Sequence, residues 1–142
     1  MSSLPNQNKL YHNFSRCQNW EERYLYLIEL GEKLSPLSEE QKQVKNQIYG
    51  CQSLVWLVME SDNVGRIQFF GDSDAVIVKG LIALLIIIFQ NKTGQQILTT
   101  DSKIFFQEIS LEQHLTPSRN QGLNAMIKSI RQRAKKIIQS NI

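Results

Sequence analysis

Hydrophobic side chains recur every three or four positions between residues 20 and 34, which is the spacing of one buried face of an α-helix. This stripe consists of Trp20, Tyr24, Leu27, Ile28 and Leu34. Asn19 is the predicted N-cap, and Glu22 follows three positions later, as in a capping box. Gly31 and Pro36 are predicted to end the helix.

The end of the chain shows the same periodicity over a longer stretch. Its stripe consists of Leu123, Met126, Ile127, Ile130, Ala134, Ile137 and Ile138. Thr116 is the predicted N-cap, because it is followed by Pro117, and proline is favoured at the first helical position. Thr93 and Asp101 are predicted to cap two further short helices.

The most apolar segment covers residues 75–89, and it is interrupted only by Lys79. It is shorter than the ~20 residues that a membrane-spanning helix needs, so the pattern predicts a buried core helix. Ser73 is its predicted cap, and Gly80 would let a neighbouring segment approach closely. The long stem of Lys79 lets its amine reach solvent or an acidic group.

Two segments in the middle of the chain are typical of β-strands. Residues 53–59 are apolar on both alternating faces, as expected for a strand that is covered on both sides. Residues 61–65 have the composition of a turn, and residues 66–70 are the returning strand. Residues 44–48 are a candidate for a short third strand. A small antiparallel sheet of two or three strands packed with about five helices is an α+β fold.

Length and composition fit one domain that spans residues 1–142. With 42% hydrophobic and 20% charged residues, the chain can bury a core without a metal or a disulfide. The polar residues 35–47 are predicted to be a loop inside this domain. Residues 1–9 contain no apolar segment of a signal peptide, so we expect a soluble, cytoplasmic protein that does not attach to membranes.

Positive charge is concentrated near the end of the chain. Residues 114–142 contain no acidic side chain, although the whole chain has a net charge of only +3. The basic residues there are Arg119, Lys128, Arg131, Arg133, Lys135 and Lys136. The helix dipole favours cations near a helix C-terminus and explains the cluster simply. The alternative is a module that binds nucleic acid or an acidic protein, but no aromatic platforms accompany these cations, so we expect no nucleic-acid partner.

Glycine and cysteine usage excludes several kinds of site. The seven glycines form neither a GxGxxG motif nor a phosphate-binding loop. Two cysteines, Cys17 and Cys51, are too few for a zinc finger, an iron–sulfur ligand set or a secreted disulfide framework. His12 and His114 have no partners at metal-ligand spacing, and we therefore expect no metal and no cofactor.

Residues 71–75 resemble the GxSxG elbow of hydrolases, with Ser73 at its centre. Ala75 replaces the second glycine, and such hydrolases need a larger parallel sheet, so helix capping is the better explanation. Asp72 and Asp74 could together bind a divalent ion. Two carboxylates are few ligands, however, and acidic residues are common at helix N-termini.

Cys51 is the strongest candidate for chemistry. It lies in the sequence YGCQS at residues 49–53, between a polar loop and a buried strand, where Gly50 can turn the chain and present the thiol. A reduced thiol there could be a nucleophile, a metal ligand or a redox group, or simply a small buried hydrophobic side chain. A thiol hydrolase that uses Cys51 with His114 is a further alternative, whereas Cys17 is interpreted as packing at a helix end.

Four blocks of sequence carry a resemblance to a known family. They are residues 19–24 (NWEERY), residues 49–53 with Val55 and Trp56, residues 71–75 with residues 77–81, and residues 114–119 (HLTPSR) with residues 121–123. In this order, over nearly the whole chain, they resemble the SufE family, the sulfur acceptors of cysteine desulfurases in iron–sulfur cluster assembly. The last block is more similar to the Suf member than to its Csd counterpart.

The resemblance implies that Cys51 is the acceptor cysteine, which carries a persulfide. The loop and partner-contact candidates that match the family are Gly50, Gln52, Ser53, Asp74 and Arg119. The implied fold resembles that of the scaffold IscU, without the scaffold's metal-binding cysteines. Leu54 departs from the family pattern, in which a polar residue is common, and makes the loop more apolar.

The resemblance further implies a sulfur carrier and desulfurase activator, not an enzyme. The donor would be a SufS-like, PLP-dependent cysteine desulfurase, and the receiver the SufBCD scaffold complex. PLP belongs to the donor, so the carrier is expected to need no cofactor of its own, and to be a homodimer. A Csd-type acceptor for a different desulfurase is the alternative. We expect the loop to tuck Cys51 against residues 54–56 and to swing out when the desulfurase docks.

Overall fold

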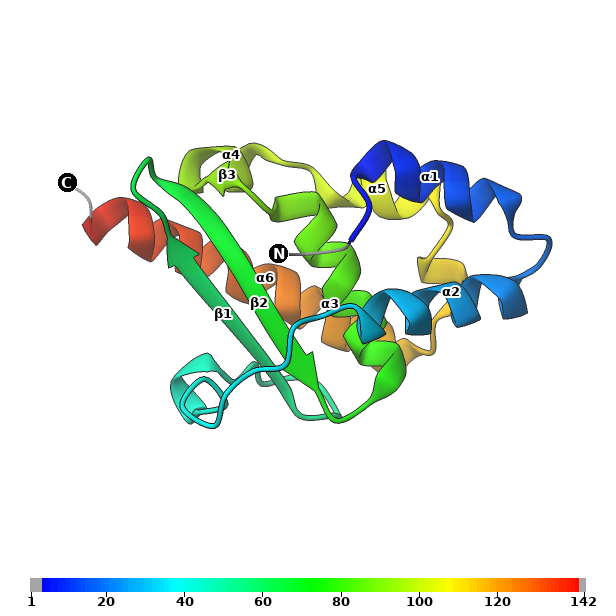
Figure 1. Ribbon diagram of the computed structural model, residues 1–142, viewed down its shortest axis with the longest axis horizontal. Helices are drawn as coiled ribbons and strands as arrows, with labels where there is room; N and C mark the ends of the chain where they lie inside the picture. Colours follow the sequence, from blue (N-terminus) through cyan, green and yellow to red (C-terminus); the bar gives the residue numbers. More distant parts are fainter. Residues whose placement is uncertain (1–3, 141–142) are drawn as a thin grey trace.

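The computed structural model describes residues 4–140. Its helices are α1 (Gln7–Arg16), α2 (Trp20–Glu32), α3 (Val76–Phe89), α4 (Gly94–Thr99), α5 (Ser102–Glu108) and α6 (Pro117–Ser140). Its strands are β1 (Val55–Ser61), β2 (Arg66–Ser73) and β3 (Lys92–Thr93), and its 3-10 turns are η1 (Val44–Asn46) and η2 (Glu112–His114). The predicted α+β class is confirmed by this set of elements (Figure 1).

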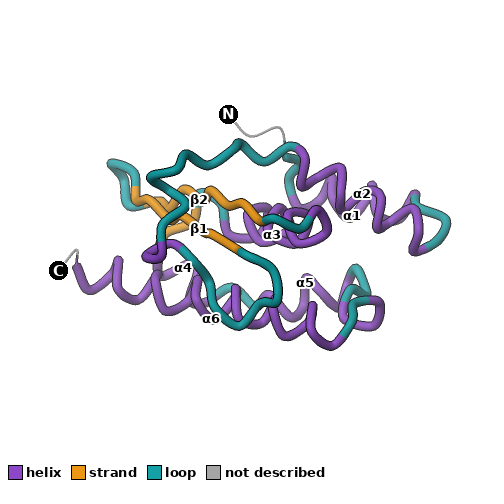
Figure 2. Tube along the Cα trace, turned by 90° about the horizontal axis from the view of Figure 1, so that it is seen from below, coloured by secondary structure: helices purple, strands orange, loops and turns teal. Residues whose placement is uncertain are grey.

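The elements are arranged in layers, which Figure 2 shows from below. α1 and α2 lie on one side, α6 lies on the other, and the sheet and α3 lie between them. The sheet is antiparallel, in the order β1-β2-β3. β1 and β2 are a hairpin in which Val55 stands opposite Ser73, and β3 adds two residues at the other edge of β2, where Thr93 pairs with Arg66.

The third strand is therefore not where the sequence placed it, and the prediction of a strand at residues 44–48 is wrong. The chain forms η1 there and then meets β1 through a single bridge, with a hydrogen bond from Ile48 N to Val55 O (2.9 Å). Gly50, which has a φ of +97°, turns the chain away from β1 directly afterwards. The ladder cannot continue past this turn, so no strand forms.

α3 confirms the predicted buried helix. Nearly every residue from Val78 to Phe89 is buried, because α2 packs along the helix on one side and β2 on another. A helix that is covered on several sides needs apolar residues around most of its circumference, which explains the continuous apolar run. Within residues 4–140, no helix combines the length and the hydropathy that crossing a membrane requires.

Four of the five helix caps predicted from the sequence are confirmed, and the fifth is wrong. The side chains that accept hydrogen bonds from the first turns of α2, α4, α5 and α6 are those of Asn19, Thr93, Asp101 and Thr116, as predicted. Ser73 does not cap α3. It is the last residue of β2, and its Oγ accepts a hydrogen bond from Ala75 N (3.2 Å) in the turn before the helix begins at Val76.

Gly31 also has a different role from the predicted one. α2 continues through Gly31 to Glu32, so the glycine does not end the helix. A Cβ at position 31 would lie 2.7 Å from Gly80 N in α3, a distance that no real side chain tolerates. Gly31 and Gly80 thus allow the close packing of α2 on α3, as predicted for Gly80.

Candidate functional site

The segment that carries Cys51 is a short loop with a fixed end on each side. Gly50 opens the loop in the left-handed conformation that glycine adopts without strain. At the other end, Leu54 N donates a hydrogen bond to the Asp74 carboxylate (3.0 Å), and Asp74 N donates to Leu54 O (3.4 Å). Residues 50–54 are thereby held beside the start of β1, and Figure 2 shows this loop beside α6.

The thiol of Cys51 faces α6. It donates a hydrogen bond to Gly122 O, with Sγ 3.5 Å from the oxygen. A Cβ at position 122 would lie only 3.3 Å from Sγ, so the close approach uses the missing side chain of the glycine. The structure differs here from the expectation that the loop tucks Cys51 against residues 54–56. Leu54 is 46% exposed, and the pocket beside the thiol is lined from α3 and α6.

This pocket has a volume of about 240 Å³. Its apolar lining residues, apart from Cys51, are Val78 and Leu81 from α3 and Leu123 and Met126 from α6. Its polar lining residues are Gln52, Ser53, Thr116, Ser118 and Arg119. Four of the residues singled out from the sequence, Cys51, Gln52, Ser53 and Arg119, thus meet at one pocket. Gly50 and Asp74 shape the loop instead, through its turn and its hydrogen bonds.

The apolar surroundings disfavour ionisation of Cys51. Burial raises the pKa of the Cys51 thiol, because a thiolate between α3 and α6 is poorly solvated. The thiol in the pocket is therefore protonated near neutral pH, in agreement with its role as a donor to Gly122 O. The reactive thiolate forms more readily once the side chain leaves the pocket.

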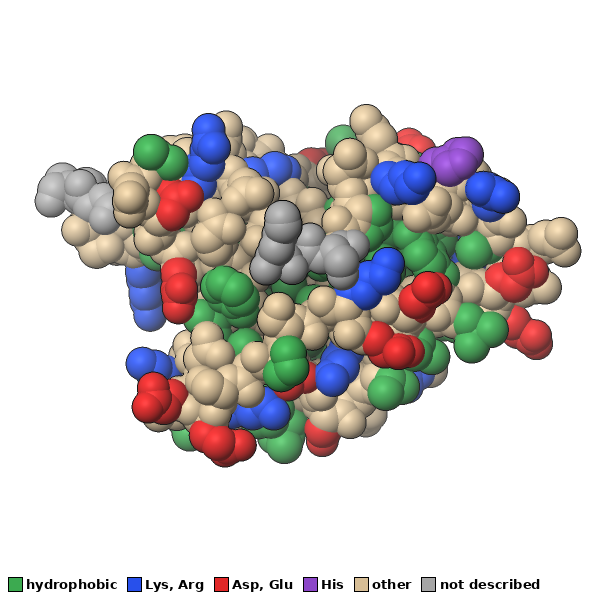
Figure 3. Space-filling view, in the orientation of Figure 1, with side chains coloured by type: hydrophobic (Ala, Val, Ile, Leu, Met, Phe, Trp, Pro, Cys, Tyr) green, Lys and Arg blue, Asp and Glu red, His purple; other side chains and the backbone are tan. Residues whose placement is uncertain are grey.

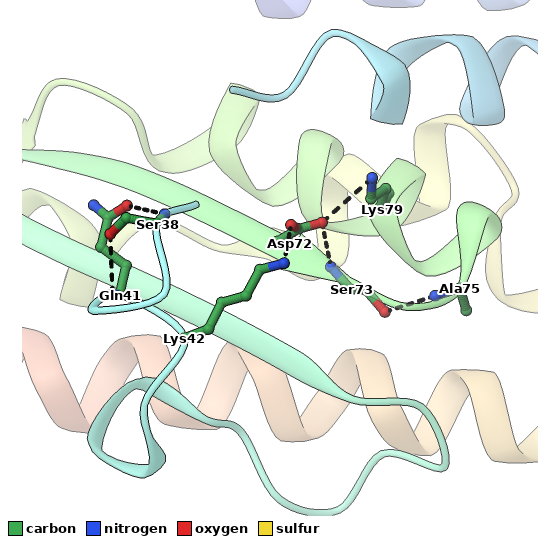
Figure 4. Close-up of polar contacts among 7 residues, drawn as sticks. All are labelled: Ser38, Gln41, Lys42, Asp72, Ser73, Ala75 and Lys79. Atoms are coloured by element: carbon green, nitrogen blue, oxygen red, sulfur yellow. Dashed lines mark hydrogen bonds and ion pairs between the residues drawn. The ribbon is translucent and has the colours of Figure 1, made fainter. Parts of the chain in front are cut away.

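Asp72 is the centre of a charged cluster with Lys42 and Lys79 (Figure 4). Lys42 Nζ and Lys79 Nζ each lie 3.3 Å from a different carboxylate oxygen of Asp72. Burial raises the pKa of Asp72, but a hydrogen bond from Ser73 N and the two ammonium groups outweigh burial and hold the pKa below its usual range. Lys79 reaches an acidic group, as its long stem suggested. The idea that Asp72 and Asp74 share a divalent ion finds no support, because each is engaged elsewhere.

His114 lies in η2, and its ring stacks on Trp20 with the ring centroids 3.8 Å apart. It does not line the Cys51 pocket, so the described part of the chain does not assemble the Cys51–His114 pair of a thiol hydrolase. Across residues 4–140, no three side chains of His, Cys, Asp or Glu gather as a metal site would require.

A larger cavity of about 610 Å³ lies between residues 4–6, residues 33–35, β2 and the C-terminal end of α3. Of the described residues that line it, Lys33 is the only one with a titratable side chain. The described residues that line this cavity include no cysteine and no acid–base pair. The chemistry of the described residues therefore points to Cys51.

The SufE family model, described as an Fe-S metabolism associated domain, matches residues 8–134. The chain belongs to the SufE family. The matched region contains the Cys51 loop and every residue that lines its pocket. SufE membership assigns the protein an accessory role in iron–sulfur metabolism.

One solved structure with the same fold is the solution structure of a hypothetical protein from Thermus thermophilus. It superposes with a TM-score of 0.75, over 96% of this chain and 98% of the other, at 20% sequence identity. At this identity the likeness shows the fold alone. It places the SufE-family chain in an architecture that an experiment has observed.

Proposed function

We propose that the protein accepts sulfur from a SufS-like, PLP-dependent cysteine desulfurase as a persulfide on Cys51, stimulates that enzyme, and passes the sulfur to a SufBCD scaffold complex. The observation that supports this most strongly is the position of Cys51. Its free thiol lies on a loop, half-buried over a pocket of about 240 Å³ that apolar and polar side chains line together. The SufE family supplies the setting in iron–sulfur metabolism.

The transfer step is a thiol exchange on sulfur. The Cys51 thiolate attacks the outer sulfur of the donor's cysteine persulfide, the new bond joins Sγ to that sulfur, and the sulfur–sulfur bond of the donor breaks. The donor cysteine leaves as a thiolate, so atoms, electrons and charge balance without an oxidant. Because the donor sulfur is already activated, Cys51 needs no adjacent histidine and no second cysteine.

The pocket and the loop support the two states that a carrier needs. With the thiol in the pocket, the raised pKa keeps Cys51 protonated and unreactive toward stray electrophiles. When the loop swings out on a desulfurase, the thiol becomes solvated and ionises more readily. Gly50 provides the freedom to turn, and the hydrogen bonds between Leu54 and Asp74 are the contacts that such a motion would break.

Mass spectrometry after incubation with a cysteine desulfurase and cysteine tests this function. We expect the mass of one sulfur atom on Cys51, loss of that adduct in Cys51→Ser, and its retention in Cys17→Ser, which is the matched control. Faster cysteine turnover by the desulfurase is expected with the wild-type chain and not with Cys51→Ser. Sulfur found on Cys17 would overturn the assignment. Loading by a Csd-type desulfurase but not by a SufS-like one would select the alternative donor.

A further inference from the structure

Gly122 differs from the other glycines in what occupies the space beside it. It lies inside α6, where a glycine is less favourable than an alanine. Gly31 and Gly80 make room for helix backbone, and Gly94 makes room for the side chain of Ile138 in α6. Beside Gly122 the nearest atoms belong to Cys51, with Sγ 3.3 Å and Cβ 3.7 Å from the position that a Cβ would take.

We propose that Gly122 is a positioning residue for Cys51. Its missing side chain forms a seat that holds the thiol, and the persulfide made from it, away from solvent. The part of the inference that concerns the persulfide rests on the proposed function. The part that concerns the thiol rests only on the contact of Sγ with Gly122 and on the hydrogen bond to Gly122 O.

The seat has room for a second sulfur atom. The pocket that continues from it has a volume of about 240 Å³, whereas one water molecule needs only about 15 Å³. Loading replaces the thiol proton on Sγ with sulfur, so Sγ can no longer donate a hydrogen bond to Gly122 O. Packing against Gly122 and against the apolar side chains of α3 and α6 is then what holds the loaded Sγ in place. Filling the seat should therefore affect the persulfide at least as strongly as the thiol.

Alkylation with iodoacetamide tests the seat without any partner protein. The rates at Cys51 and Cys17 are measured in the same folded chain, so Cys17 is an internal reference. Relative to Cys17, we expect Cys51 to react at least about threefold faster in Gly122→Ala and about tenfold faster in Gly122→Val, the latter equal to about 1.4 kcal/mol. Gln121→Ala, at the exposed neighbouring position on α6, should leave the ratio unchanged. An unchanged or lower ratio in Gly122→Ala overturns the proposal, whatever the valine variant does.

A second measurement separates the contact with Sγ from a general role in the helix. Alanine is the better helix former, so Gly122→Ala should raise the thermal midpoint more in a Cys51→Ala background, where Sγ is absent, than in the wild-type background. Equal gains in the two backgrounds would show that Sγ does not occupy the seat, and would overturn the proposal.

The persulfide is tested last, with chains loaded by a desulfurase and cysteine. Gly122→Ala should lose its sulfur to added glutathione at least about threefold faster than the wild-type chain and the Gln121→Ala control, by the same exposure argument. Equal rates would overturn the persulfide part. If the wild-type chain takes up no sulfur at all, the carrier function fails, while the alkylation and melting results still decide whether Gly122 seats the thiol.

Discussion

At the scale of single residues, the proposed function places two conflicting requirements on Cys51. A sulfur acceptor must become a thiolate to react, whereas a stored thiol or persulfide must be kept from oxidants and from other thiols. In the structure Cys51 is in the protected state, because its thiol is half-buried and its proton is donated to Gly122 O. Under the proposed function, the reactive state depends on movement of the loop and not on a permanent base beside the thiol.

This arrangement predicts how the reactivity of Cys51 depends on pH. Burial raises the pKa of the thiol, so the folded chain keeps the proton over a pH range in which the unfolded chain has lost it. The contribution of the protonated Cys51 thiol to the free energy of unfolding is present below the pKa of the thiol in the unfolded chain. It is lost as the pH rises through the pKa of the thiol in the folded chain. We expect the alkylation rate of Cys51 to rise at a higher pH in the folded chain than in the chain unfolded in urea, measured between about pH 7 and pH 10. A midpoint at or below that of the unfolded chain would contradict the protected state.

At the scale of elements, the loop that carries Cys51 depends on contacts from residues far away in the sequence. Asp74, just before α3, binds the backbone of Leu54 at the end of the loop. Lys42, in the preceding polar segment, binds Asp72 on β2 and lies with its Nζ 5.4 Å from the Trp56 ring centre. The β2–α3 connection thus organises both the loop and the segment that leads into it.

Removal of the Asp74 carboxylate should loosen the loop without unfolding the protein. In Asp74→Ala, Leu54 N loses its acceptor, and we expect about 1 kcal/mol less protection against hydrogen exchange at residues 50–54. Asp74→Asn is the matched control, because its side-chain oxygen can still accept the hydrogen bond. Hydrogen exchange followed by mass spectrometry provides the measurement. Equal hydrogen exchange in Asp74→Ala and the wild-type chain would rule out the idea that the Asp74 carboxylate holds the end of the loop in place.

Asp72 should matter for stability more than for sulfur uptake. Asp72→Asn removes the charge that Lys42 and Lys79 share, and we expect a loss of about 1–3 kcal/mol in the free energy of unfolding at pH 7. Since the pKa of Asp72 is lowered in the folded state, its contribution is present above about pH 4 and is lost as the pH falls through the folded pKa. The difference between variant and wild type in urea unfolding should therefore shrink in acid. A difference that persists unchanged at acidic pH would refute the ion-pair explanation.

At the scale of the whole molecule, some of the basic residues near the end of the chain stabilise the fold by donating hydrogen bonds to backbone carbonyls. Arg131 donates hydrogen bonds to the carbonyls of Leu98 and Thr100, and Arg133 donates to the carbonyl of Leu57 at the edge of β1. Two of the six cations of residues 114–142 are thus half-buried and engaged with backbone. On the face shown in Figure 3, basic and acidic side chains are interspersed over the described residues. α6 lies on the opposite side of the molecule from this face, so only the backbone contacts of Arg131 and Arg133 bear on the nucleic-acid alternative, and they give these two cations a structural role.

Mutation of a cation that binds a backbone carbonyl and mutation of an exposed cation on α6 should change the free energy of unfolding by different amounts. Arg133→Gln removes a donor from Leu57 O and should lower the free energy of unfolding by about 1–2 kcal/mol. Lys135→Gln removes a charge from an exposed position, and its effect should stay within about 0.5 kcal/mol. Urea unfolding of the two variants makes the comparison. Similar small losses in both would mean that Arg133 is a surface cation like Lys135.

The homodimer that the family resemblance implies is also a property of this scale, and it stays a prediction. Sedimentation equilibrium should give a mass of twice the 16.4 kDa of the chain. A mass of 16.4 kDa at micromolar concentration would contradict it.

The sequence by itself determined the features that depend on neighbours along the chain. The spacing of apolar residues predicted α2 and α6, a continuous apolar run predicted α3, and four side-chain caps predicted where helices begin. The hairpin of β1 and β2 followed from a turn between two apolar segments. Cys51 could be selected because a lone cysteine after a glycine in a polar loop is a local pattern, and because the surrounding blocks resemble the SufE family.

Only the tertiary structure decided which distant residues meet. The third strand is a two-residue segment after α3, too short to show any alternation, and Ser73 ends a strand because its partner Val55 extends the ladder that far. The pocket beside Cys51 is lined by Gly122, 71 positions later in the chain, and by side chains of α3. No sequence pattern predicts that a helix glycine contacts a loop cysteine, because their contact depends on how the packed elements bring α6 beside the loop.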